Sequence, residues 1–148
     1  MKVEIRAARD QDCDLIRNIQ LDLKRPVRPD YRAGEFLIAW HGNMAVGCAA
    51  TSPQPGGGYF YGLAVKREWQ RKGIGGQLML ARLEGLRAMH AGYAVALVMF
   101  WNSRFFRAHG FAPFKRGELP LLGASHADLT NPAFRRSAVM LRGLDEPS

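Results

Sequence analysis

Apolar residues recur along the chain with two different periods, and each change of period marks a new element. An alternation of apolar and charged residues over 3–8 predicts a first strand. Apolar residues spaced by three and four positions then predict a helix that is capped by Asp10 and ends at about Lys24. The basic segment from Arg25 to Asp30 contains Pro26 and Pro29, so we expect a solvated loop that interrupts the helix.

Three strands are predicted next. Residues 35–41 and 44–51 form a hairpin around Gly42-Asn43, a dipeptide suited to a tight turn. Residues 52–58 combine serine, proline and glycine, which predicts a flexible loop. The aromatic and β-branched stretch at 59–65 predicts the central strand.

A second helix is predicted over 75–91, because one face collects apolar residues at helical spacing. These residues are Met79, Leu83, Leu86 and Met89. Gly92 stands where a helix-ending glycine is expected, and the apolar run at 95–100 predicts a buried strand. Because a helix joins two strands, we expect the strands at 59–65 and 95–100 to be parallel.

The last third of the chain predicts shorter elements. We expect a short helix at 102–109, a sixth strand at 111–114, a long loop at 115–136 and a final strand at 137–144. The chain is therefore predicted to be an α/β protein. Its central sheet would be mixed, mostly antiparallel, and built from about seven strands with flanking helices.

Composition narrows the classes of function. A length of 148 residues and a hydrophobic content of 47% suit one folded domain over 1–148. Two cysteines, Cys13 and Cys48, are too few for a disulfide framework or a metal cluster, which favours the cytoplasm and no bound metal. We expect neither a signal peptide nor a membrane span. The net charge of +8 suits a polyanionic partner: nucleic acid, acidic lipid or a phosphorylated small molecule.

A basic, glycine-rich segment separates the central strand from the second helix. Glycines at 73, 75 and 76 let an anion approach the backbone, and Arg71 and Lys72 add positive charge. The first N–H groups of a helix lack helical partners and attract phosphate. The segment is not a P-loop, because it lacks Gly-Lys-Ser/Thr, and its glycine spacing does not complete a dinucleotide fingerprint.

Two motifs resemble those of the GNAT acetyltransferase superfamily. The first is Gln70-Arg71-Lys72-Gly73-Ile74-Gly75, which follows Leu63-Ala64-Val65 and resembles the family's acetyl-CoA signature. The second is Phe105-Phe106-Arg107-Ala108-His109-Gly110-Phe111, which resembles the Phe-Tyr-x-x-x-Gly-Phe segment after the fifth strand. The order of elements resembles the GNAT fold over nearly the whole chain. The resemblance implies a single N-acetyltransferase domain that uses acetyl-CoA.

The resemblance also implies a set of cofactor-binding residues. The backbone at 63–65 would pair with the pantetheine arm and place a donor near the thioester carbonyl, and the N–H groups at 71–76 would bind the pyrophosphate. Asn102 would either contact the cofactor arm or cap the third helix, and both alternatives stay open. The full set is Leu63, Ala64, Val65, Gln70, Arg71, Lys72, Gly73, Ile74, Gly75, Gly76 and Asn102.

The sequence departs from the family pattern at both usual catalytic positions. The glutamate that many relatives carry on the fourth strand is Gly62 here, and the general-acid tyrosine is Phe106. Three explanations stay open: another side chain acts on the proton, water and backbone carbonyls suffice, or the protein binds the cofactor without turnover. The candidate side chains are Glu35, Tyr61, His41 and Glu118, of which Glu35 and Tyr61 are retained.

Three hypotheses for the function follow. The first is direct acetyl transfer from acetyl-CoA, in a ternary complex, to a primary amine of a small molecule, amino acid or protein. The second is a non-catalytic module that binds or senses acyl-CoA. The third, and weakest, is a basic nucleic-acid-binding domain. We expect no membrane partner, and a homodimer is possible because many relatives form one.

Overall fold

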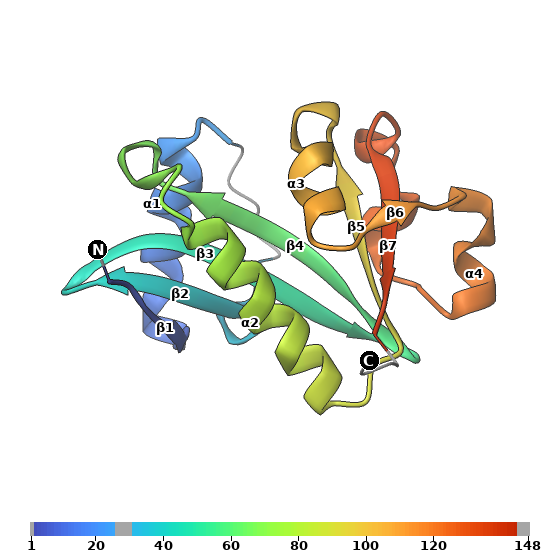
Figure 1. The fold of residues 1–148 in the computed structure, drawn as a ribbon, viewed down its shortest axis with the longest axis horizontal. Helices are drawn as coiled ribbons and strands as arrows, with labels where there is room; N and C mark the ends of the chain where they lie inside the picture. Colours follow the sequence, from blue (N-terminus) through green and yellow to red (C-terminus); the bar gives the residue numbers. More distant parts are fainter. Residues whose placement is uncertain (1, 26–30, 145–148) are drawn as a thin grey trace. The chain divides into compact units, whose positions relative to one another are not determined.

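The computed structural model describes residues 2–25 and 31–144 (Figure 1). The strands are β1 (Glu4–Ala7), β2 (Phe36–His41), β3 (Met44–Gln54), β4 (Gly57–Val65), β5 (Tyr93–Val98), β6 (Ala112–Pro113) and β7 (Ala138–Gly143). The α-helices are α1 (Cys13–Asp22), α2 (Ile74–Ala88), α3 (Ser103–Ala108) and α4 (Leu119–Leu122). Of the loop predicted at 25–30, only Arg25 is among the described residues.

The strands form one mixed sheet in the order β1-β2-β3-β4-β5-β7-β6. The pairs β1–β2, β2–β3, β5–β7 and β6–β7 are antiparallel, whereas β4 and β5 are parallel. This arrangement confirms the predicted α/β class, the seven strands and the parallel pair around a connecting helix. The strands and helices also follow the predicted order along the chain, except for α4, which lies in the segment predicted as a long loop.

Within this fold the chain divides into two compact units. Unit 1 comprises Met1–Ala50 and Gly62–Arg82, and unit 2 comprises Thr51–Tyr61 and Leu83–Ser148. The division falls inside β4, between Tyr61 and Gly62. That the whole chain acts as one domain stays a prediction.

The core of unit 1 forms where α1, the antiparallel strands and the first turns of α2 bury their apolar side chains. Its fully buried members include Ile19, Phe36, Ile38, Ile74 and Leu78. A Cβ atom at Gly47 would lie 3.2 Å from both the Ala64 carbonyl oxygen and the Leu78 side chain. The glycine therefore permits close packing of β3 against its neighbours.

The cap predicted at Asp10 is wrong. A 3-10 turn at Asp10–Asp12 precedes α1, and the Asp12 carboxylate accepts a hydrogen bond of 2.8 Å from the Arg9 N–H. Asp12 is buried and also lies 3.6 Å from the Arg9 guanidinium. Asp12, rather than Asp10, therefore stabilises the start of this helical segment, because its carboxylate pairs with the Arg9 N–H, which the helix itself leaves without a partner.

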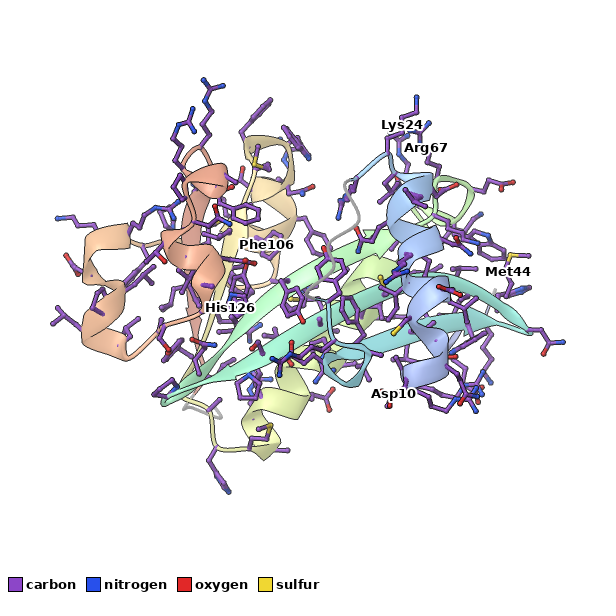
Figure 2. The ribbon with its side chains drawn as sticks, turned by 180° about the vertical axis from the view of Figure 1, so that it is seen from behind. Asp10, Lys24, Met44, Arg67, Phe106 and His126 are labelled. Atoms are coloured by element: carbon purple, nitrogen blue, oxygen red, sulfur yellow. The ribbon has the colours of Figure 1, made fainter. Side chains whose placement is uncertain are left out.

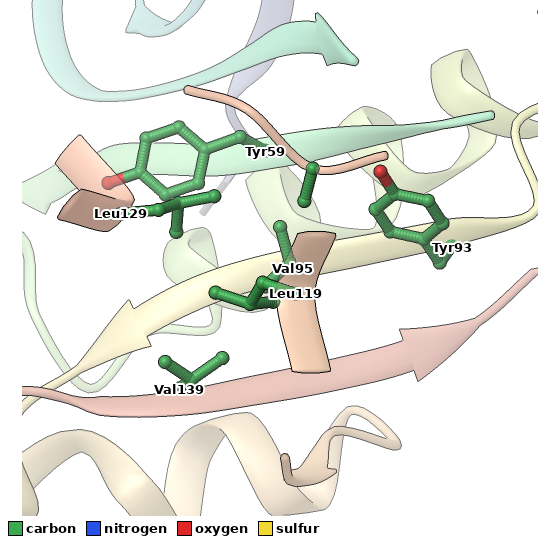
Figure 3. Packing of buried hydrophobic residues seen from close by; sticks show 7 residues of the cluster. Tyr59, Tyr93, Val95, Leu119, Leu129 and Val139 are labelled. Atoms are coloured by element: carbon green, nitrogen blue, oxygen red, sulfur yellow. The ribbon is translucent and has the colours of Figure 1, made fainter. Parts of the chain in front are cut away.

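The core of unit 2 forms between β4, β5 and β7 and the segment that connects β6 with β7 (Figure 3). Its buried members are Tyr59, Tyr93, Val95, Leu119, Ala124, Leu129 and Val139. The connecting segment was predicted as a long loop, but it contains α4 and 3-10 turns at 116–118, 127–130 and 132–134. Leu119 and Leu129 anchor it, and such isolated apolar residues give too short a pattern to predict helices.

The flexible loop predicted at 52–58 is also wrong. β3 continues to Gln54, β4 begins at Gly57, and the turn between them uses Gly56 with a φ of +76°. A Cβ atom at Gly57 would overlap the Tyr93 ring, whose hydroxyl donates to the Pro55 carbonyl at 3.1 Å. Gly57 therefore allows close packing against Tyr93. In the sequence, a glycine that allows close packing looks the same as a glycine in a flexible loop.

The apolar pattern misplaces the ends of α2 and β5. The helix ends at Ala88, so Met89 is 62% exposed and does not join the core. His90 takes the left-handed conformation (φ +61°) expected of Gly92, whose N–H instead donates to the Gly56 carbonyl at 2.7 Å. β5 ends at Val98, and Phe100 is 84% exposed.

We predict that Gly57→Ala lowers the free energy of unfolding by about 1–3 kcal/mol, because the added methyl group overpacks the site against the Tyr93 ring. Gly117→Ala is the matched control, since a Cβ atom there meets nothing within 4 Å, and it should change stability by less than about 0.5 kcal/mol. Urea titration measures both values. Equal stability of the two variants would contradict the close-packing role.

Candidate active site

The centre of the candidate site is a left-handed residue within β4. Gly62 has a φ of +68°, and a Cβ atom there would lie 2.9 Å from the Phe36 ring. Both facts restrict this position to glycine. The ladder between β4 and β5 pairs Gly58 with Ala94 and ends at the pair of Phe60 with Ala96. The predicted pantetheine-binding residues 63–65 thus follow both the end of this ladder and the left-handed turn.

Side chains of unit 1 bind the carbonyl groups that follow this turn. The Gly62 carbonyl accepts from Gln20 Nε2 at 3.1 Å and from Cys48 Sγ at 3.5 Å. The Leu63 carbonyl accepts from Arg25 Nη1 at 2.6 Å. A carbonyl oxygen can accept two hydrogen bonds, so the Gly62 oxygen is fully used by its two donors, whereas the Leu63 oxygen can accept a second one.

The predicted signature residue Gln70 is joined directly to the predicted pantetheine-binding strand. Its Nε2 donates to the Val65 carbonyl at 2.9 Å. The Lys66 N–H donates to the Val46 carbonyl at 2.9 Å, which holds the end of β4 against β3. The strand and the glycine-rich segment are therefore fixed to one another inside unit 1.

The glycine-rich segment has the geometry of an anion site. Arg71 (φ +64°) and Gly73 (φ +83°) are both left-handed, and a Cβ atom at Gly73 would meet nothing within 4 Å. The first helical hydrogen bond runs from the Gln77 N–H to the Gly73 carbonyl. The N–H groups at 74–76 precede it, where a helix presents free donors and partial positive charge. Buried Ile74 fixes this end of the helix in the core.

Basic side chains gather at the same end of unit 1. Figure 2 labels Lys24, which follows the end of α1, and Arg67 at the same end of the view. The Arg67 N–H donates to the Asp22 carboxylate at 2.8 Å, which ties the end of α1 to the 3-10 turn at 67–69. With exposed Arg71 and Lys72 in the neighbouring segment, these residues make the region electropositive and suited to phosphate.

The four catalytic candidates are divided between the two units, with two in each. In unit 1, Glu35 is half-buried, with its carbonyl accepting from Arg82 Nη1 at 3.3 Å, and His41 is exposed beside the Trp69 ring at 4.8 Å. In unit 2, Glu118 is exposed in a 3-10 turn. Tyr61 is half-buried and stacks on Tyr59, with ring centroids 5.5 Å apart. The two tyrosines therefore lie on the same face of the strand.

Unit 2 contains a polar cluster that sequence reasoning missed. The Tyr59 hydroxyl donates to buried Asp128 at 2.9 Å, and the Asp128 N–H donates to His126 Nδ1 at 3.1 Å. The His126 ring lies 4.4 Å from the Tyr59 ring and 5.9 Å from the Tyr61 ring. The available signal was His126 and Asp128, two positions apart, in a segment otherwise predicted as loop. The cluster pins that segment to β4.

The structure explains why Phe106 is a phenylalanine. It is 6% exposed and packs edge-on against Phe60 and Phe111, with ring centroids 5.8 and 5.2 Å away. A hydroxyl there would enter an aromatic core. Asn102 stands before the first residue of α3, but its side chain makes no capping hydrogen bond, which disfavours the capping alternative.

Metal and thiol chemistry receive no support from the described residues. No group of three or more His, Cys, Asp or Glu side chains within 2–25 and 31–144 could hold a metal ion. Cys48 is fully buried, and burial raises the pKa of its thiol to about 12, so the thiol is protonated. Within the same described ranges, no helix is long and apolar enough to cross a membrane.

The comparisons with known proteins agree with this geometry. The model of the acetyltransferase (GNAT) domain family matches residues 27–113. No curated protein matches the sequence. Among solved structures, N-acetylglutamate synthase from Neisseria gonorrhoeae, complexed with coenzyme A and L-arginine, superposes with a TM-score of 0.81 at 24% identity over 97% of this chain. The chain spans 34% of that protein's length.

Two other solved structures match over nearly their whole length. Rv2747 from Mycobacterium tuberculosis, in complex with CoA and NLQ, has a TM-score of 0.74 at 20% identity, covering 95% of this chain and 99% of that one. The ribosomal-protein-S18-alanine N-acetyltransferase from Escherichia coli has a TM-score of 0.74 at 14% identity, covering 99% and 97%. The chain belongs to the GNAT acetyltransferase family, and the predicted fold is confirmed.

We predict that Gly62→Ala destabilises the protein more than Gly42→Ala does. Both residues have a positive φ, so both variants carry the left-handed penalty of about 1–2 kcal/mol. Gly62→Ala adds overpacking against Phe36, worth about a further 1–3 kcal/mol, whereas a Cβ atom at Gly42 meets nothing within 4 Å. Urea denaturation measures the difference. Equal destabilisation would mean that the Phe36 contact does not restrict Gly62.

Proposed function

We propose that this protein is an N-acetyltransferase that moves the acetyl group of acetyl-CoA to a primary amine by direct attack in a ternary complex. The observation that carries the proposal is the joining of two cofactor-binding segments. Gln70 Nε2 donates to the Val65 carbonyl at 2.9 Å, which joins the strand at 63–65 to the segment that leads into the helix start at Ile74, and we take the two segments as one binding surface.

The cofactor would lie along this surface. The pyrophosphate would take the N–H groups at 74–76, with charge from Arg71 and Lys72, and the pantetheine arm would follow residues 63–65. A backbone N–H suits the thioester carbonyl, because a fixed donor stabilises the negative charge that develops on its oxygen during attack. Asn102 remains a candidate for a contact with the arm.

The reaction balances without a covalent enzyme intermediate. The amine nitrogen attacks the carbonyl carbon, a C–N bond forms, and the tetrahedral intermediate expels CoA as its thiolate when the C–S bond breaks. The amine loses one proton and the thiolate takes up one. Cys48 does not act as a nucleophile in this path, since its thiol is buried and protonated.

Tyr61 is the stronger of the two retained candidates for the acceptor's proton. It precedes Gly62 directly and stacks on Tyr59, next to His126, so its neighbours include other groups that exchange protons. Glu35 stays a candidate for acceptor binding at the start of β2. The acceptor is a small amine, an amino acid or a protein amine.

A second function is favoured by one specific observation. Gly62 and Phe106 replace the family's usual glutamate and tyrosine, and the packing around both restricts what can stand there. A module that binds acyl-CoA without turnover would have the same site. It differs from the enzyme in releasing no thiol from acetyl-CoA with any amine.

The experiment combines binding with turnover. Thermal unfolding is measured with acetyl-CoA, CoA and ATP, and a ligand at about a hundred times its dissociation constant adds roughly 2.7 kcal/mol of stability. We expect both CoA compounds, but not ATP at equal concentration, to raise the midpoint by several degrees. Thiol release with a panel of amines then separates enzyme from binding module. Equal effects of all three ligands would contradict the cofactor site.

Gly75→Phe should abolish the acetyl-CoA-dependent rise in midpoint, because a large side chain at the helix start blocks the approach of the pyrophosphate. Leu80→Phe is the matched control, since Leu80 lies in the next turns of the same helix and is exposed. This control should keep the wild-type rise. A wild-type rise in midpoint for Gly75→Phe would mean that the helix start is not part of the acetyl-CoA site.

A further inference from the structure

The Gly62 carbonyl is held by two buried side chains from different elements of unit 1. Gln20 of α1 and Cys48 of β3 are 1% and 0% exposed. Gln20 Nε2 lies 3.1 Å from the Gly62 oxygen and 3.7 Å from Cys48 Sγ, and the Cys48 thiol donates to the same oxygen at 3.5 Å. We call Gln20 and Cys48 the carbonyl clamp.

The clamp leaves one polar atom of Gln20 without a partner. Its Oε1 is buried and accepts no hydrogen bond within the part of the chain that the structure describes. Exchanging the amide oxygen and nitrogen would not repair this, because it would place the amide oxygen against the Gly62 oxygen. A half-satisfied buried amide is less stable than an apolar side chain of similar shape. Stability alone therefore favours a different residue at position 20.

The clamp determines where the next N–H points. Within a trans peptide the C=O and N–H bonds point in opposite directions. Holding the Gly62 carbonyl toward Gln20 and Cys48 therefore directs the Leu63 N–H away from them. Gly62 has no Cβ atom and a positive φ, so its backbone has more accessible conformations than that of other residues. The direction of the Leu63 N–H must therefore be fixed by neighbouring side chains.

We propose that Gln20 and Cys48 are positioning residues for acetyl transfer: by holding the Gly62 carbonyl, they direct the Leu63 N–H at the thioester carbonyl oxygen. This inference rests on the proposed function, in which that N–H polarises the thioester. The clamp touches neither substrate nor cofactor and acts through one peptide group. Cys48 contributes as a protonated donor, which agrees with its burial.

Gln20→Met tests the proposal, because methionine has similar length but no donor for the Gly62 carbonyl and no unpaired acceptor. With the best amine of the panel, kcat should fall about tenfold to a hundredfold, which approaches the loss seen when one such donor is removed from an active site. The KM for acetyl-CoA and the CoA dissociation constant should stay at the wild-type value. The unfolding midpoint should equal or exceed that of wild type.

Three further variants separate positioning from packing. Cys48→Ser keeps a donor and should retain kcat, whereas Cys48→Ala removes it and should lower kcat severalfold. Ile19→Val alters the neighbouring buried residue of α1 without touching the clamp, so it should lower the midpoint and keep kcat. A wild-type kcat in Gln20→Met, or a joint loss of midpoint and CoA affinity, would overturn the proposal.

A second readout is independent of turnover. In amide NMR spectra of the full chain, Gln20→Met and Cys48→Ala should shift the Leu63 N–H resonance, and Cys48→Ser should shift it less. If wild type releases no thiol with any amine, the enzymatic function fails, yet this spectrum still decides whether the clamp exists. An unchanged Leu63 resonance in Gln20→Met would overturn it, and Cys48→Ala provides the same test if Gln20→Met does not fold.

Discussion

The rest of the site depends on one left-handed residue inside a strand. Gly62 turns the chain at the end of the ladder between β4 and β5, so the backbone that follows it is directed by unit 1. The Phe36 ring excludes a side chain at this position. Gln20 and Cys48 bind the Gly62 carbonyl, and Arg25 binds the Leu63 carbonyl. The position at which many relatives carry a glutamate is thus restricted to glycine in this chain.

Sequence patterns predicted the features that depend on local chemistry. The period of the apolar residues located the seven strands and their order, and the glycines of 73–76 located a helix start with the geometry of an anion site. The motif around Gln70 was informative because its parts act within a few residues of each other. Gln70 itself bridges to Val65, only five positions away.

Sequence patterns failed where a residue's role depends on a distant neighbour. Gly57 packs against the Tyr93 ring rather than lying in a flexible loop, and the left-handed residue after α2 is His90 rather than Gly92. The cluster of Tyr59, His126 and Asp128 joins segments almost seventy positions apart, and no periodicity reports such a contact. Gln20 reads as an ordinary polar residue of a helix, although its amide is fully buried against Gly62.

The most direct test of the account is amide hydrogen exchange, measured residue by residue by NMR, with and without acetyl-CoA. The account predicts that exchange at Leu63 and Val65 slows when the cofactor is bound, because their backbone groups then pair with the pantetheine arm. Exchange at Lys66, whose N–H already binds Val46, should change far less. ATP at the same concentration should leave all three unchanged. Exchange at Leu63 and Val65 that is unaffected by saturating acetyl-CoA would contradict the central claim.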